Sequence, residues 1–411
     1  MSPKLIVLGV VATVVSVAPI IASAQQHPAN PNVPVTSRPR PDFDPLGIRV
    51  GSFSLFPVLE LAGEYNDNIF ASQDEDDDFI GFVRPSVTLS SNFAQNSLDF
   101  SAGGEIARYE EFDDENYEDA FVRALGRLDI RRDLSAAGLL EYRLLHENRD
   151  DPEDTGASEV TRFDRFRVRG TLDKTFNRVG TALTGMYQRY DYEDAGELTN
   201  DDRDRDQFDV ALRVGYDISP RFDAFVEGQG QFQIHDSEID DTGVNRDFQK
   251  FSVVAGADID ITSVLFGEIF GGITSADFDD PAFSDETGFT AGGGLTWNVT
   301  ELTTIIGTVE RSIEPTTQSD ASSNFQTQLT LDVDHELLRN VLVGAGFQYD
   351  RDEFEGLDED EDTFEVGARV QYLLNRNIAV EGSYAYQTRI ADDDTEEFRR
   401  NVVRIGLVGR L

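Results

Sequence analysis

Residues 364–389 read FEVGARVQYLLNRNIAVEGSYAYQTR, and apolar and polar side chains alternate along both halves of this stretch. A short turn near Asn375–Asn377 separates the halves. The apolar set is Phe364, Val366, Val370, Tyr372, Ile378, Val380, Tyr384 and Tyr386. The polar set is Glu365, Arg369, Gln371, Glu381, Ser383, Gln387 and Arg389. Because strict alternation is the β-strand signal, the stretch predicts two antiparallel strands, each with one apolar face.

The same pattern recurs from Leu55 to Leu411, where alternating segments are joined by short turns and long acidic loops in turn. The short turns fall near Asn92–Asn96, Arg131–Leu134, Thr175–Arg178, Ser219–Arg221, Thr262–Ser263, Asn298–Glu301, His335–Asn340 and Asn375–Asn377. The long loops fall near Gln73–Asp78, Glu110–Glu118, Asn148–Ser158, Asp194–Asp206, Asp236–Asp247, Asp277–Glu286, Pro315–Ser323, Arg351–Asp362 and Asp392–Glu397. Counting the segments between them predicts about eighteen strands.

Strand length and aromatic placement distinguish between a soluble β-sandwich or solenoid and a membrane barrel. Each segment is long enough to cross a bilayer at a tilt, which takes about 9–11 residues. Tyrosines recur near strand ends, as an interfacial girdle requires: Tyr65, Tyr109, Tyr142, Tyr187, Tyr216, Tyr349 and Tyr372. The expected fold is all-β, a single transmembrane antiparallel up-and-down β-barrel with short periplasmic turns and long acidic extracellular loops. An even number of strands puts both termini in the periplasm.

The chain before the barrel divides into two segments. Lys4, the apolar run Leu5–Ile21 and the small residues Ala22-Ser23-Ala24 predict a signal peptide over residues 1–24, with an uncleaved membrane anchor as the alternative. Residues 25–54 carry six prolines between Pro28 and Pro45 and predict an extended, mobile periplasmic leader, with a docking motif as the alternative. The barrel would then occupy residues 55–411.

Composition limits the classes of function. The formal net charge of −43 argues against nucleic acid as a partner, because phosphate binding needs an excess of Lys and Arg. The chain has no cysteine, so either a large core or a closed hydrogen-bond ladder has to hold the exported protein without disulfides. The expected partners are outer-membrane lipid, lipopolysaccharide and the barrel-assembly machinery, and no cofactor is expected.

The charged residues predicted to face the lumen are unevenly distributed. A basic wall is expected from Arg123, Arg127, Arg143, Arg165, Arg167, Arg169 and Arg213. An acidic wall is expected from Asp223, Glu227, Asp258, Asp260 and Glu268. Opposed walls would create a transverse field that selects solutes by charge, and an anionic saccharide would suit the arginines. Alternatively, the charges pair across the strands and fill the interior.

Two other kinds of site are weaker candidates. The loop carboxylates Asp76, Asp77 and Asp78 offer the oxygen ligands that divalent cations prefer, but their spacing matches no calcium loop, and a solvated acidic surface is the alternative. The histidines His27, His146, His235 and His335 are scattered, and no G-x-S-x-G motif accompanies them. We therefore expect no catalytic residues and no enzymatic activity.

Three motifs near the start of the barrel resemble a known family. They are GIRVGSF at 47–53 followed by Pro57, YNDNIFA at 65–71, and FVRPSVTLSSNF at 82–93. They resemble the start of the β-barrel porins of α-proteobacteria, outer-membrane barrels often associated with exopolysaccharide or capsule production. The resemblance implies location and fold. We therefore expect one of two functions. The first is a porin-like channel for small hydrophilic solutes or saccharides, and the second is a structural or accessory barrel in polysaccharide export without general pore activity.

Overall fold

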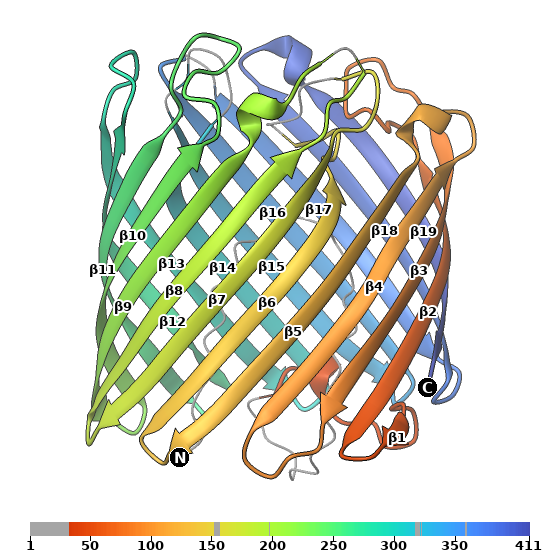
Figure 1. Cartoon of the computed structure of the whole chain (residues 1–411). Helices are drawn as coiled ribbons and strands as arrows, with labels where there is room; N and C mark the ends of the chain where they lie inside the picture. Colours follow the sequence, from red (N-terminus) through yellow and green to blue (C-terminus); the bar gives the residue numbers. More distant parts are fainter. Residues whose placement is uncertain (1–32, 152–156, 197, 317–320, 322, 358–359) are drawn as a thin grey trace.

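The computed structural model describes residues 33–151, 157–196, 198–316, 321, 323–357 and 360–411. Eighteen antiparallel strands, β2 to β19, follow one another around a closed barrel, and the last strand pairs with the first (Figure 1). The strands are β2 Phe53–Asn66, β3 Asp78–Ser91, β4 Ser97–Tyr109, β5 Tyr117–Arg131, β6 Leu134–His146, β7 Arg162–Phe176, β8 Val179–Tyr192, β9 Arg205–Ser219, β10 Phe222–His235, β11 Phe248–Thr262, β12 Leu265–Phe278, β13 Glu286–Thr300, β14 Thr303–Pro315, β15 Ser323–Leu338, β16 Val341–Glu355, β17 Asp360–Leu373, β18 Ile378–Ala391 and β19 Phe398–Arg410. A further short strand, β1 (Ile48–Val50), pairs with the start of β2.

The connections confirm the predicted number of strands and the up-and-down order. At one end of the barrel, called here the turn end, short links such as residues 132–133 join consecutive strands. At the other, the loop end, longer segments such as residues 236–247 do so and carry the short 3-10 helices η2 (Asp113–Glu115), η3 (Asp201–Arg203) and η4 (Asp394–Glu396). Closure leaves no free sheet edge, so the ladder satisfies the backbone polar groups without disulfides. In the part of the chain described, no helix is long and apolar enough to span a membrane.

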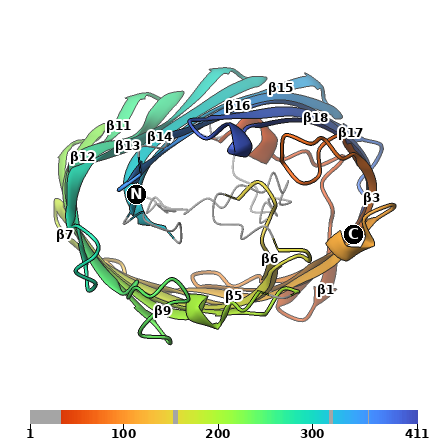
Figure 2. The same cartoon turned by 90° about the horizontal axis from the view of Figure 1, so that it is seen from above.

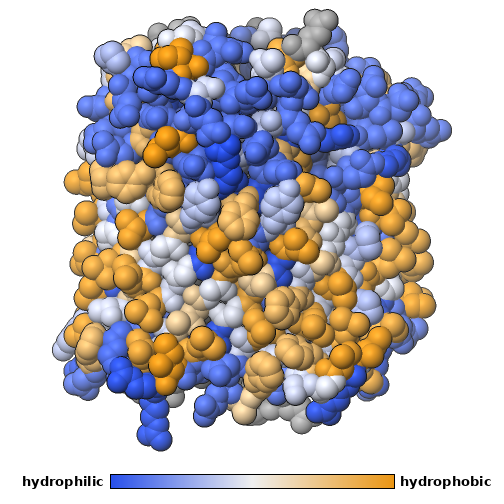
Figure 3. Space-filling model, in the orientation of Figure 1, coloured by the Kyte–Doolittle hydropathy of each residue, from blue (hydrophilic) through white to orange (hydrophobic). Residues whose placement is uncertain are grey.

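The barrel carries its apolar side chains on the outside. On β19, Val403, Ile405 and Leu407 are 44–66% exposed, and Arg404 lies on the opposite face. On the face of the barrel that Figure 3 shows, apolar side chains form a broad belt below a polar rim at the loop end. Such a belt is the surface that a barrel presents to lipid.

One predicted girdle residue faces the other way. Tyr109 ends β4 on the inner face and packs beside Ile80, Phe82 and Tyr117. The preceding residue, Arg108, has a half-exposed side chain on the outer face. Because side chains alternate along a strand, Tyr109 points into the barrel. The interfacial role predicted for Tyr109 is therefore wrong.

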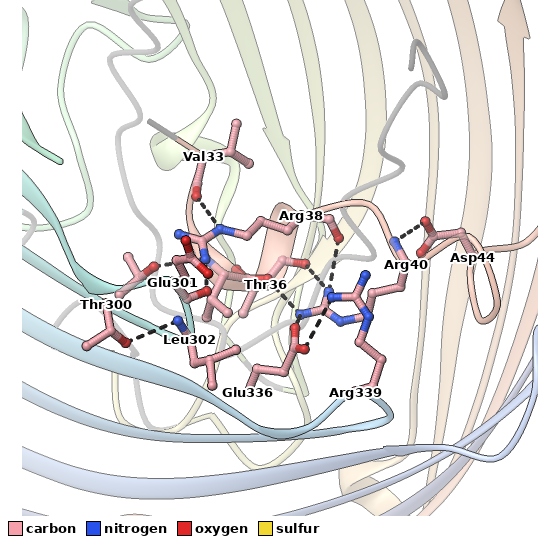
Figure 4. A network of polar contacts seen from close by, with 12 residues as sticks. Val33, Thr36, Arg38, Arg40, Asp44, Thr300, Glu301, Leu302, Glu336 and Arg339 are labelled. Atoms are coloured by element: carbon pink, nitrogen blue, oxygen red, sulfur yellow. Dashed lines mark hydrogen bonds and ion pairs between the residues drawn. The ribbon is translucent and has the colours of Figure 1, made fainter. Parts of the chain in front are cut away.

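The segment before the barrel differs from the mobile leader that the prolines predict. The 3-10 helix η1 (Val35–Ser37) lies inside the turn end, where the backbone N–H of Val35 donates to Thr304 Oγ1 at 2.8 Å (Figures 1 and 2). Arg40 forms a buried ion pair with Glu336 on β15 at 3.0 Å, and its guanidinium also donates to the carbonyl of Val35 (Figure 4). The proposed signal peptide, residues 1–24, lies outside the described residues.

The same segment continues across the turn end. Arg376 donates to the carbonyl of Pro41 at 2.7 Å, and Arg410 on β19 donates to the carbonyl of Phe43 at 3.2 Å. The Phe43 ring packs against an inner-face cluster that includes Leu373. Residues 33–46, called here the N-terminal segment, therefore contact the inner wall from β14 to β19.

Candidate functional site

The loop between β6 and β7 enters the lumen over its described residues 147–151, and Figure 2 shows this yellow part leaving the wall after β6. Asp150 on this loop accepts hydrogen bonds from Arg400 on β19 at 2.6 Å and from Gln387 on β18 at 3.3 Å. Arg389 donates to the backbone carbonyl of Asp150 at 2.7 Å. The loop thus reaches a part of the wall that is remote from it in the chain.

Two further ion pairs hold this inward loop near its root. Arg203 on η3 binds Glu147 with both guanidinium Nη atoms, and both side chains are buried. Arg149 binds Glu115 on η2 in the same bidentate way, at 2.6 and 3.0 Å. Bidentate guanidinium–carboxylate pairs fix geometry as well as charge, so the loop is held at three places: by strands β18 and β19, by η3 and by η2.

The neighbours of Asp150 stabilise its negative charge. Burial acts to raise the pKa of this carboxyl, but Arg400, Gln387 and Arg389 outweigh it and hold the pKa below its usual value. Asp150 is therefore ionised at neutral pH. Sequence reasoning found neither Asp150 nor Arg400.

Five of the arginines predicted for the basic wall lie together on β5, β6 and β7. Register pairing aligns Arg123 with Glu141 and Glu141 with Arg167, while Arg143 is directly opposite Arg165. Arg169 follows two residues after Arg167 on the same face. We call this set the arginine row: Arg123, Arg143, Arg165, Arg167 and Arg169.

Glu141 is the one carboxylate embedded in the arginine row among the described residues, and sequence reasoning did not select it. Only 1% of it is exposed. It lies 2.5 Å from Arg167, 3.2 Å from Arg143 and 3.6 Å from Arg165. A single carboxylate shared by three guanidinium groups offsets their mutual repulsion only in part.

Two arginines predicted for the basic wall lie elsewhere. Arg127 pairs with Asp129 at 3.1 Å, closer to the turn end of β5. Arg213 on β9 binds Glu268 at 2.5 Å and lies 3.4 Å above the centre of the Phe225 ring. Arg213 therefore belongs to the acidic residues rather than to the arginine row.

The residues predicted for the acidic wall lie together on β10, β11 and β12 and do not oppose the arginines. Asp223, Asp258 and Glu268 are register neighbours close to the turn end, and Glu227 is paired in register with Arg213. Asp260 ends the same group near the turn after β11. These strands, β10 to β12, are separated from β7 by only β8 and β9, so the two sets flank each other. The expectation that these two walls oppose each other is wrong. In a ring of eighteen strands, opposite strands are nine places apart, whereas β10 to β12 are only three to five places from β7.

A different acidic surface faces the arginine row. Strand β15 stands nine places from β6 (15 − 6 = 9) in a ring of eighteen, and Figure 2 shows β15 and β6 on opposite long sides of an oval. The inward carboxylates there, called the acidic face, are Glu310, Asp350, Asp352 and Glu365. Arg167 and Glu365 are each the sixth residue of a strand that begins at the loop end, so they lie at a similar depth.

Amides rather than cations hold part of the acidic face. Asp350 accepts hydrogen bonds from Gln328 and Gln348 at 2.8 and 2.7 Å. Asp352 accepts from Asn324 at 2.6 Å. Neutral donors leave the negative charge of these groups in place, so the lumen carries opposite charges on facing walls.

The other predicted sites have mainly structural contacts. Asp78 caps the loop after β4 by accepting from the backbone N–H groups of Glu111 and Phe112 at 3.1 Å. Asp76 and Asp77 are exposed, and within the described residues no three His, Asp or Glu side chains form a group able to hold a metal.

The histidines that the structure describes pair with neighbouring side chains. His146 binds Asp119 at 3.0 Å, and His235 binds Asp247 at 3.1 Å. His335 contacts the hydroxyl of Thr303 at 3.0 Å. His27 lies outside the described residues.

A closed antiparallel barrel with an apolar outer belt and a charged lumen defines the class of this protein as a porin-like channel of the outer membrane. The chain belongs to the family described as "Putative beta-barrel porin 2", whose model matches residues 40–411. This confirms the β-barrel porin resemblance.

Solved structures match the chain at low identity. OpdL of Pseudomonas aeruginosa is 10% identical, with a TM-score of 0.45, and the match covers 88% of this chain and 99% of that one. OpdO of the same organism is 13% identical, with a TM-score of 0.47 and coverages of 88% and 98%. The ferric enterobactin receptor PfeA is 6% identical, with a TM-score of 0.47 and coverages of 87% and 80%. No curated protein matches the chain. We draw nothing further from these likenesses.

Proposed function

We propose that this protein passes small hydrophilic solutes, saccharides among them, across the outer membrane, with its turn end and both termini in the periplasm. The orientation follows the rule that outer-membrane barrels have short periplasmic turns and longer outer loops. A barrel of about 18 strands is generally wide enough to leave an aqueous lumen. The observation that carries the proposal is the pair of oppositely charged inner walls, the arginine row and the acidic face, at a similar depth.

Conductance of the purified, folded barrel in planar lipid bilayers tests this function. Folding is first verified by the shift in gel mobility between unheated and boiled samples. We expect stepwise current increases in potassium chloride as single barrels insert. Folded protein that inserts and never forms an ion-permeable state would overturn the proposal.

A second candidate function is an accessory barrel in exopolysaccharide or capsule export without general pore activity. The two segments that enter the lumen favour it, because the inward loop and the N-terminal segment both occupy space that solutes need. A strain lacking the gene separates the candidates. Reduced uptake of small solutes with normal surface polysaccharide supports the channel, and the converse supports the accessory role.

We also propose that the protein is not an enzyme. The described histidines contact other side chains: His146 pairs with Asp119, His235 with Asp247, and His335 with the hydroxyl of Thr303. A screen of the purified barrel for hydrolysis of ester and peptide substrates tests this, and turnover abolished by His146→Gln would contradict it.

A further inference from the structure

We propose that the arginine row binds solutes that carry a carboxylate on a ring, such as a sugar acid. This inference rests on the proposed channel function and names the class of solute at its charged inner wall. It starts from an imbalance of charge: the arginine row holds five guanidinium groups, and its one carboxylate, Glu141, pairs with three of them. Among the described residues, no carboxylate lies within 4.0 Å of Arg123 or Arg169.

The guanidinium groups also keep unused hydrogen-bond donors. The Nε atoms of four members are buried and have no hydrogen-bond partner within the described chain: Arg123, Arg143, Arg165 and Arg167. A guanidinium presents its donors in a planar fork that matches the two oxygens of a carboxylate. These Nε atoms are enclosed, but the side chains of Arg143, Arg165 and Arg167 are 33%, 17% and 24% exposed, so a carboxylate in the lumen can reach their outer nitrogens. A bound carboxylate would reduce the repulsion between Arg143 and Arg165, which are directly opposite in register.

Aromatic rings border the same row of side chains. Phe121 is the register partner of Arg143, whose guanidinium carbon lies 5.8 Å from the ring centre. On the other side, Tyr190 is the register partner of Arg165. Together, Phe121, Arg143, Arg165 and Tyr190 form one line across β5 to β8. Rings at both ends of a pair of arginines suit a solute that combines an anionic group with a flat, less polar face.

The acidic face on the other side of the lumen strengthens the preference of an anionic solute for the arginine row. The acidic face across the barrel repels an anion toward the arginine row, since opposed charges create a transverse field. A carboxylated solute would therefore be held at β5 to β7 during its passage.

Current block by a matched pair of sugars tests the inference. Sodium glucuronate and glucose have similar rings and differ in the carboxylate. We expect glucuronate to reduce the current through single wild-type barrels at a concentration at least tenfold below that of glucose. In a potassium chloride gradient, we expect the reversal potential to indicate preference for chloride.

Three variants locate the site. The double variant Arg165→Gln/Arg167→Gln should raise the glucuronate concentration for half block at least tenfold. Arg178→Gln removes an exposed arginine in the turn after β7 and should leave the block unchanged. Arg169→Gln is the second test, because Arg169 has no ion pair with Glu141 and its loss leaves that pairing in place for folding.

The outcomes separate the two proposals. If folded wild-type barrels conduct no ions, the proposed function fails and the inference fails with it. If they conduct and glucuronate blocks no better than glucose, only the inference is overturned. The same conclusion follows if glucuronate blocks the Arg165→Gln/Arg167→Gln and Arg169→Gln variants as well as it blocks wild type.

Discussion

The carboxylate of Asp150 lies 2.6 Å from a guanidinium nitrogen of Arg400, although the two residues are 250 positions apart in the chain. The contact joins the inward loop after β6 to the last strand of the barrel. This ion pair links the loop to the wall inside the lumen, and Gln387 and Arg389 also donate hydrogen bonds to Asp150. Substitution or protonation of Asp150 should therefore change how far the inward loop obstructs the lumen.

Asp150→Asn should loosen the inward loop. The change removes the charge that Arg400 pairs with, and losing a hydrogen bond between charged groups costs about 1.5–3 kcal/mol. We expect higher and noisier single-channel conductance, with the barrel still folded. Asp74→Asn, in the exposed loop after β2, is the matched control and should behave as wild type. Equal conductance of all three proteins would show that this ion pair does not position the loop.

The pH dependence of the loop follows from the lowered pKa of Asp150. A carboxyl whose pKa is lower in the folded protein stabilises the fold above its unfolded pKa, about 3.9, and this contribution is lost as the pH falls through the folded pKa. Between about pH 5 and pH 8 the loop contact should therefore be constant. The conductance of wild type should approach that of Asp150→Asn only below about pH 4. A difference between the two proteins that disappears near pH 6 would contradict this assignment.

The N-terminal segment should be held by Arg40. Removing one partner of a buried ion pair leaves the other charge unpaired, at a cost of about 3–5 kcal/mol, so Arg40→Gln should free the segment from Glu336. We expect faster chymotrypsin cleavage after Phe43, whose ring would leave the inner wall, and a larger conductance. Asp42→Asn, an exposed change in the same segment, should alter neither property. Slow cleavage in both variants would mean that the contacts of Pro41 and Phe43 suffice.

Much of the fold follows from the sequence, because alternation, turns and loops are local signals. The eighteen strands and their faces were predictable for that reason. The acidic face was predictable in principle: once eighteen strands are counted, half a turn from β6 leads to β15 and its neighbours, where Glu310 and Asp350 lie. The N-terminal segment was not, since six prolines suggest a mobile chain and nothing local indicates that Arg40 meets Glu336.

The inward loop shows a different limit. Asp150 is one acidic residue among many in the loops, and its partner Arg400 lies on a strand 250 residues later. No periodicity relates the two positions. Glu141 could have been found by alternation, because it shares a face with Arg143 two residues later, but its importance depends on the register with Arg167 on the next strand.

The apolar outer face should contact lipid. Ile405 lies near the middle of β19 and is 66% exposed. Arginine on the lipid face of a barrel near the bilayer midplane costs about 2–4 kcal/mol, so Ile405→Arg should lower the free energy of unfolding in lipid vesicles by that amount. Ile239→Arg, in an exposed outer loop, is the control and should cost little. Equal stability of both variants in urea titrations would argue against lipid contact at β19.

Glu141 should stabilise the barrel and limit its preference for anions at the same time. Glu141→Gln leaves Arg143, Arg165 and Arg167 without their shared carboxylate, and breaking a buried charge pair costs about 3–5 kcal/mol, an upper bound in a hydrated lumen. Unfolding in urea should show a loss of stability that shrinks at high salt, because ions screen the repulsion.

The matched control for this change is Glu118→Gln. Glu118 pairs with Arg108 where both side chains are about half exposed, and such surface pairs contribute about 0–1 kcal/mol. We expect the reversal potential of Glu141→Gln to shift further toward chloride while that of Glu118→Gln stays at the wild-type value. If the two variants lose equal stability and keep equal selectivity, Glu141 has no special role among the carboxylates of the barrel and the arginine row carries no concentrated charge.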